Sequence, residues 1–108
     1  MVLSTHVLDI SLGEAAAGLE VELFSINGEK REQIVSTATS EDGRAAFGAE
    51  LSAGLYELVF HVGDYFTQHG IASLYTEVPV RFRVSDAKAR YHLPLLLSPW
   101  GYSTYRGS

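Results

Sequence analysis

The sequence contains no cysteine, and this absence excludes a disulfide framework, a cysteine-ligated zinc site and a thiol nucleophile. Basic residues are also scarce, since eight Lys and Arg stand against thirteen Asp and Glu, for a formal net charge of -5. The few cations form no basic run along the chain. A polyanion needs a basic surface to bind, so we expect no nucleic acid partner.

Long apolar runs are missing as well. No stretch approaches the ~20 apolar residues that a membrane-spanning helix needs, so we expect no membrane partner. Residues 1–10 lack the basic region, apolar region and cleavage site of a signal peptide, which favours a cytoplasmic location. The chain has 108 residues, the size of one domain, and shows no linker or repeat. We therefore expect a single domain over residues 1–108.

What the sequence does contain is a period-two alternation broken by Gly-rich turns, which predicts antiparallel β-structure. We expect strands at residues 2–10, 19–26, 33–39, 44–47, 54–62, 77–84, 89–97 and 102–106, with a loop at 11–18. One short helix is expected from a cap at Asp64 to about Gly70. Pro94 predicts an edge position, a bulge or an interrupted ladder in the seventh strand. The expected fold is an all-β, two-sheet β-sandwich of eight strands with one short helix.

The alternation also assigns side chains to faces of the strands. In the first strand one face carries Leu3, Thr5, Val7 and Asp9, and the opposite face carries Ser4, His6 and Leu8. In the second strand Leu19, Val21 and Leu23 are expected to point inward. The only histidine of the first strand therefore shares its face with Ser4 and Leu8.

Four histidines are candidates for chemistry, because histidine titrates near neutral pH. For His6 and His92, the residues alone favour a hydrogen-bonded strand or interface histidine over a catalytic one. His61 is expected on a solvent-facing alternation and His69 near a helix end. No His-x-His or His-Glu-x-x-His spacing occurs, so no metal site is expected.

Other catalytic motifs are weakly supported. A Ser-His-Asp triad stays open, because geometry and not spacing sets it, but the chain has no Gly-x-Ser-x-Gly elbow. No Gly-rich loop follows a strand and opens a helix, so no nucleotide cofactor is expected.

Two further features allow either a structural or a functional interpretation. Arg44 follows the turn residues Asp42 and Gly43, and it is either a solvated turn residue or a guanidinium fork for a planar, oxygen-rich ligand. The last residues, 102–108, are aromatic and polar, with two tyrosines and an arginine. On the residues alone, an interface segment is favoured there over an active site.

Several segments match a known pattern. They are residues 4–9 (Ser-Thr-His-Val-Leu-Asp), 39–44 (Thr-Ser-Glu-Asp-Gly-Arg), 92–99 (His-Leu-Pro-Leu-Leu-Leu-Ser-Pro), 101–104 (Gly-Tyr-Ser-Thr) and 105–108 (Tyr-Arg-Gly-Ser). In this order they resemble the 5-hydroxyisourate hydrolases, a family with the transthyretin fold. Transthyretin, the hormone carrier of that fold, lacks the terminal Tyr-Arg-Gly-Ser and the histidine pair, so the resemblance is to the hydrolases.

The resemblance implies a transthyretin-like sandwich and hydrolysis of 5-hydroxyisourate to 2-oxo-4-hydroxy-4-carboxy-5-ureidoimidazoline in urate degradation. It implies a homotetramer of two dimers, with sites at the subunit interface and no cofactor. The implied catalytic residues are His6, Arg44, His92 and Ser108, and the implied substrate-binding residues are Tyr105, Arg106 and Gly107.

The expected chemistry is direct attack by water, with His92 or His6 as general base and a slight preference for His92. Arg44 would stabilise the oxyanion, Arg106 would bind substrate or fix the tail, and Gly107 would allow close backbone approach. The main alternative is a noncatalytic transthyretin-like carrier of small molecules, and a structural sandwich domain is a further one. A polar site disfavours the carrier.

Overall fold

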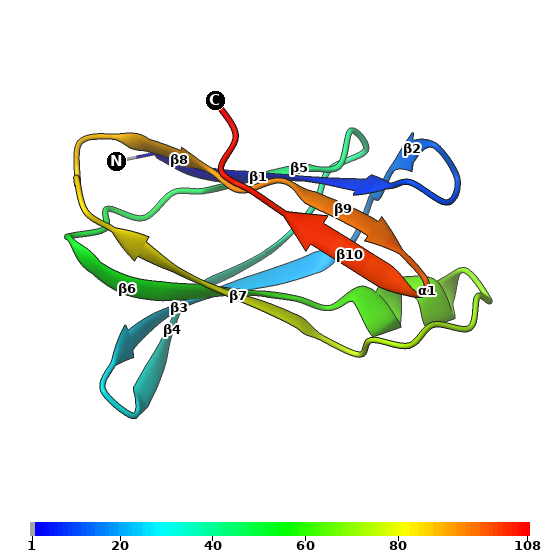
Figure 1. Cartoon of the computed structure of the whole chain (residues 1–108), viewed down its shortest axis with the longest axis horizontal. Coiled ribbons are helices and arrows are strands. Elements are labelled where there is room, and N and C mark those ends of the chain that lie inside the picture. The colour runs from blue at the N-terminus through cyan, green and yellow to red at the C-terminus, as the bar shows by residue number, and fades with distance from the viewer. Residues whose placement is uncertain (1) are drawn as a thin grey trace.

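The computed structural model describes residues 2–108, and it forms two stacked sheets with one short helix at their end (Figure 1). The strands are β1 Val2–Asp9, β2 Glu14–Ala15, β3 Glu20–Asn27, β4 Lys30–Ala38, β5 Arg44–Phe47, β6 Gly54–Phe60, β7 Val78–Val84, β8 Arg90–His92, β9 Leu95–Ser98 and β10 Gly101–Thr104, and the helix is α1 Val62–Gln68.

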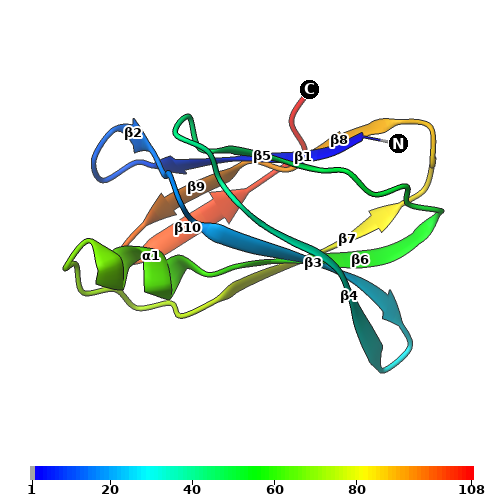
Figure 2. The ribbon, with the colours of Figure 1, turned by 180° about the vertical axis from the view of Figure 1, so that it is seen from behind.

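The two sheets have different orders. One runs β10-β9-β1-β2, with β5 and β8 also paired to β1, and the other runs β4-β3-β6-β7. Seen from behind, the same two sheets lie one above the other, and α1 lies at one end (Figure 2). The all-β, two-sheet sandwich expected from the sequence is therefore confirmed.

The number and limits of the strands differ from the expectation of eight. The segment 11–18 is not only a loop, because β2 pairs with the end of β1. The expected strand 89–97 is divided into β8 and β9, and β4 begins at Lys30 instead of residue 33. The division falls at Pro94, which has no N–H for the ladder, while the Leu93 carbonyl accepts from Thr5 Oγ1 at 2.6 Å. Of the three possibilities that Pro94 left open, the interrupted ladder is found.

The core lies between the inner faces of the two sheets. The face of β1 that carries Leu3, Thr5, Val7 and Asp9 is buried, as are Leu19, Val21 and Leu23, so both face assignments are consistent with the fold. Phe60 and Phe66 are the largest side chains that are fully buried. The opposite face of β1, with Ser4 and His6, is thereby directed away from the core.

Helix α1 begins three residues earlier than expected, since the expected N-cap was Asp64. Its N-cap is His61, and Asp64 lies inside the first turn without making a side-chain cap. Tyr65 of α1 donates to Asp9 Oδ2 at 3.1 Å, which ties the helix to β1. Burial, together with the negative charge of Asp9, raises the pKa of Tyr65 to about 12. The early start places Tyr65 and Phe66 in the buried layer, because Val62, Tyr65 and Phe66 share one helical face.

His61 is not the solvent-facing strand residue that the sequence predicted. Its Nε2–H donates to Glu22 Oε1 at 2.6 Å, and its side chain is only 17% exposed. Burial disfavours the charged imidazolium, but the hydrogen bond to Glu22 and the nearby charges of Glu22, Glu20 and Glu77 raise the pKa of His61 above 6.5. The alternation failed here because β6 ends at Phe60 and the chain turns into α1.

This ion pair predicts a pH-dependent contribution to stability. A raised pKa in the folded state stabilises the protein below pH about 6.5, and the contribution is lost as pH rises through the folded-state pKa of His61. We expect Glu22→Gln to lower the free energy of unfolding more at pH 5.5 than at pH 8.5. Urea unfolding of both proteins at the two pH values measures this, and an equal loss at both would contradict the charged pair.

Within residues 2–108, no helix combines the length and apolar character needed to cross a bilayer.

Candidate functional site

Strand β1 brings the candidate residues together on its outer face. In the antiparallel ladder with β5, His6 is opposite Arg44 and Ser4 is opposite Ala46. In the parallel ladder with β8, on the other side of β1, Ser4 is opposite His92. Neighbouring strands lie about 4.8 Å apart, so these side chains share one small area of the sheet. Arg44 and His92 therefore flank β1 from opposite sides.

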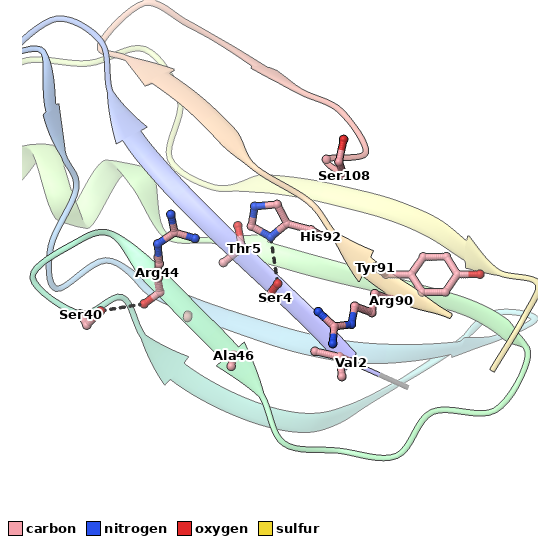
Figure 3. A pocket seen from close by; sticks show the side chains of 12 residues that line it. Val2, Ser4, Thr5, Ser40, Arg44, Ala46, Arg90, Tyr91, His92 and Ser108 are labelled. Carbon is pink, nitrogen blue, oxygen red and sulfur yellow. Dashed lines mark hydrogen bonds between the residues drawn. The ribbon is translucent and has the colours of Figure 1, made fainter. Parts of the chain in front are cut away.

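A hollow of about 600 Å³ opens on this face (Figure 3). Its walls come from β1, β5, β8, the turn before β5 and the end of the chain. It is lined by Val2, Ser4, Thr5, Ser40, Arg44, Ala45, Ala46, Arg90, Tyr91, His92, Gly107 and Ser108. The size suits a small molecule, and the lining mixes charged, hydroxyl and apolar groups.

His92 is held from two directions. Its Nδ1 lies 2.8 Å from Ser4 Oγ, and its carbonyl accepts from the Gly107 N–H at 2.7 Å. A Cβ atom added at Gly107 would lie 2.6 Å from Cδ2 of the His92 ring. Glycine is therefore needed at position 107 so that the tail can pack on the ring. The other ring nitrogen, Nε2, is turned away from Ser4 (Figure 3).

His6 lies beside the hollow and does not line it. Its Nε2 is 2.8 Å from the Asp42 carbonyl. A carbonyl oxygen can only accept, so Nε2 carries a proton, and in the neutral ring Nδ1 holds the lone pair. His6 thereby fixes the turn that precedes Arg44, and the two side chains are direct neighbours in the ladder.

Arg44 projects from the start of β5, where the turn 41–43 sets its position. Gly43 has φ 79° and packs so closely on β1 that a side chain there would collide with the Val7 carbonyl. Arg44 Nε lies 3.6 Å from Asp42 Oδ2, and the side chain is 59% exposed. The Ser40 hydroxyl, which donates to Asp42 at 2.5 Å, lowers the pKa of Asp42, and the Arg44 N–H and the charges of Arg44 and His6 add to this. Asp42 therefore stays ionised at neutral pH and orients a guanidinium that is open to solvent.

Contacts between Arg106 and strand β8 hold the C-terminal tail in place. The Arg106 guanidinium donates to the Arg90 carbonyl at 3.0 Å and lies 4.4 Å from the centre of the Tyr91 ring. Of the two roles left open for Arg106, these contacts favour fixing the tail. Tyr105 is 55% exposed and does not line the hollow, whereas Gly107 and Ser108 do.

The structure thus brings together Arg44, His92, Gly107 and Ser108 around the hollow, with His6 and Arg106 at its margin. The sequence interpretation missed Ser4 and Arg90, which also line it. Alternation placed Ser4 beside His6, but it could not show that the partner strand carries His92. In the described part of the chain, no three His, Asp or Glu side chains are grouped as metal ligands. The expected lack of metal and cofactor stays a prediction.

Comparisons with known proteins agree with this arrangement. A 5-hydroxyisourate hydrolase 2 of Rhizobium meliloti is 48% identical over 98% of this chain and 95% of that protein. The solved structure of Klebsiella pneumoniae 5-hydroxyisourate hydrolase is 41% identical, covers all of both chains and superposes with a TM-score of 0.89. Sea bream transthyretin, at 24% identity and a TM-score of 0.89, shares the fold over 97% of this chain and 93% of that one. Residues 3–107 match the HIUase/Transthyretin family, and the chain belongs to this family.

Proposed function

We propose that this protein is an enzyme that hydrolyses 5-hydroxyisourate to 2-oxo-4-hydroxy-4-carboxy-5-ureidoimidazoline. The observation that carries the proposal is the convergence of Arg44, His92 and Ser108, from three separate segments, on one hollow in a chain of this family. Relatives that align over nearly the whole chain are 5-hydroxyisourate hydrolases, which supports the same reaction. A planar substrate rich in carbonyl and N–H groups suits a hollow of mixed polarity.

The proposed reaction is direct attack of water on a ring amide carbonyl. His92 takes a proton from the water through Nε2 as the oxygen forms its bond to the carbonyl carbon. The carbonyl oxygen becomes an oxyanion, which the Arg44 guanidinium stabilises. When the C–N bond breaks, the imidazolium of His92 returns the proton to the departing nitrogen, and the ring opens to a carboxylic acid that ionises. His92 is preferred to His6 as base because His92 lines the hollow.

The remaining candidates have supporting roles. His6, with Nε2–H bound to the Asp42 carbonyl, would orient substrate or water through Nδ1 from the Arg44 side. Ser108 lies at the opposite wall and offers a hydroxyl to the substrate ring. Tyr105 does not line the hollow of its own chain, so we assign a substrate contact from it to the site of a neighbouring subunit.

A noncatalytic carrier is the alternative on the same fold. The hollow holds Arg44, Arg90 and His92, and an apolar ligand would have to desolvate these groups without compensating hydrogen bonds. The polar lining therefore favours catalysis on a polar substrate over transport of a hydrophobic one.

The test is the rate of decay of 5-hydroxyisourate freshly generated by urate oxidase, with and without this protein. We expect strong acceleration by the wild-type protein and a kcat about 10²-fold lower for Arg44→Ala, since one lost oxyanion donor costs roughly 3 kcal/mol. Because the substrate also decays unaided, the rates and not the end points are compared. A folded protein that leaves the spontaneous rate unchanged would refute the proposed activity.

We also propose a homotetramer of two dimers, with each site completed at a subunit interface. Tyr105 is half-exposed and does not line the hollow of its own chain, which is consistent with a contact to a neighbouring subunit. Sedimentation of the active protein tests the assembly. A sedimenting monomer with full activity would contradict it. A cytoplasmic location stays a prediction from the sequence.

A further inference from the structure

Ser4 makes a contact with His92 to which the proposed mechanism assigns no function. It lies on the outer face of β1, directly opposite His92 in the parallel ladder. Its Oγ is 2.8 Å from His92 Nδ1 and makes no other hydrogen bond within residues 2–108 (Figure 3). Ser4 also lines the hollow. This contact joins two residues that lie 88 positions apart in the sequence.

A hydroxyl partner leaves two arrangements of protons, because it can donate or accept. If the Ser4 hydroxyl donates to Nδ1, the neutral ring carries its proton on Nε2 and cannot accept a proton there. If Nδ1–H donates to Ser4 Oγ, the lone pair of Nε2 is free. The choice between these arrangements decides whether His92 can act as a base through Nε2.

The second arrangement is favoured if His92 acts as a base, because its ring becomes positively charged when Nε2 takes a proton. When Nε2 takes a proton, both ring nitrogens become N–H donors, and Nδ1–H then needs an acceptor. Ser4 Oγ already occupies that place at 2.8 Å, so no group has to reorient during proton transfer. The hydroxyl proton of Ser4 is left free to donate into the hollow, toward water or a substrate carbonyl.

We propose that Ser4 is a positioning residue whose Oγ accepts a hydrogen bond from Nδ1–H of His92, and so keeps the Nε2 lone pair available in the hollow. The base function of His92 rests on the proposed hydrolase activity, but the tautomer is a property of the protein without substrate. Ser4 thereby acts on the reaction through His92.

The tautomer can be read from the ring nitrogen shifts of ¹⁵N-histidine-labelled protein, at a pH well above the usual imidazole pKa of about 6.5. We expect the Nδ1–H tautomer for His92 in the wild type and in Ser4→Thr, which keeps a hydroxyl. In Ser4→Ala we expect a shift toward the Nε2–H form. His92→Asn identifies the signal.

Kinetics supply the second measurement. We expect Ser4→Ala to lower kcat by about 10- to 100-fold with a smaller change in KM, the size of a lost hydrogen bond to a charged group. Ser4→Thr should recover most of kcat. Ser36→Ala is the matched control, because Ser36 also lies on a strand and makes one side-chain hydrogen bond, to Glu20 on the other sheet. Its kcat should equal that of the wild type.

The outcomes separate this inference from the proposed function. An active enzyme with the Nε2–H tautomer at His92, or a folded Ser4→Ala with unchanged tautomer and kcat, would overturn the role of Ser4 alone. A wild type with the Nδ1–H tautomer that fails to accelerate substrate decay would overturn the activity and leave the hydrogen bond assignment intact. The wild-type spectrum is sufficient for the tautomer should Ser4→Ala fail to fold.

Discussion

Replacing His92 by alanine is expected to lower kcat for 5-hydroxyisourate hydrolysis by at least about 10²-fold, the typical contribution of a positioned general base. His92 is the one histidine that lines the hollow among the described residues, and its Nδ1 is engaged by Ser4 while Nε2 is turned away from that contact. Steady-state kinetics with freshly generated substrate measure the loss.

Alanine substitutions at two other histidines, His6 and His69, test whether the loss is specific to the site. His6→Ala should also lose about 10²-fold if His6 positions substrate or water, since its Nε2–H is held by the Asp42 carbonyl beside Arg44. His69→Ala is the control, because His69 lies at the end of α1, where its ring Nδ1 is 2.7 Å from the Tyr65 carbonyl, and it does not line the hollow.

A near-normal kcat for His92→Ala would contradict the first prediction and remove His92 from the mechanism.

Replacing Gly107 by alanine is expected to lower kcat about as much as His92→Ala does, although it adds only one methyl group. The added methyl carbon would lie 2.6 Å from His92 Cδ2 and 3.3 Å from Pro94 Cγ, so either the ring or the tail must shift. A displacement of about 1 Å in a catalytic group can cost about 10²-fold in rate. We expect a loss of that size in kcat, with a melting temperature close to that of the wild type.

Gly48→Ala is the matched control for this substitution. Neither glycine has a positive φ that would strain alanine, but a Cβ at Gly48 meets no atom within 4 Å, in contrast to Gly107. Gly48→Ala should therefore keep both kcat and melting temperature. Full activity in Gly107→Ala would mean that the tail can yield without moving His92, and that its contact with the ring is not needed for catalysis.

Both predictions concern contacts that sequence patterns describe only in part. The alternation in β1 correctly separated Leu3 and Val7 from Ser4 and His6, because side chains alternate between the two faces of any strand. It did not reveal that Ser4 forms a hydrogen bond with His92, since the pairing of β1 with β8 depends on the register of two distant strands. The sequence pointed to His92 as the base, but its contact with Ser4 is visible only in three dimensions.

The errors in the sequence interpretation have the same origin. His61 follows the alternation of β6, yet it occupies the N-cap position of α1, and its side chain binds Glu22 on β3 instead of capping the helix. Asp64 has the chemistry of a helix cap, but α1 begins earlier, where Val62, Tyr65 and Phe66 can be buried and Tyr65 can reach Asp9. Burial of two aromatic side chains outweighs one capping hydrogen bond, so tertiary packing decided the boundary.

The sequence by itself determined the class of fold, the inward faces of the strands, the lack of thiol chemistry and the segments that resemble the family. These follow from composition and from patterns over a few neighbouring residues, which depend on local stereochemistry. Only the tertiary structure decided the interruption at Pro94, the pairing of Ser4 with His92 and the packing of Gly107 on the His92 ring. Such contacts join residues far apart in the chain, and their geometry depends on how the two sheets pack around one core.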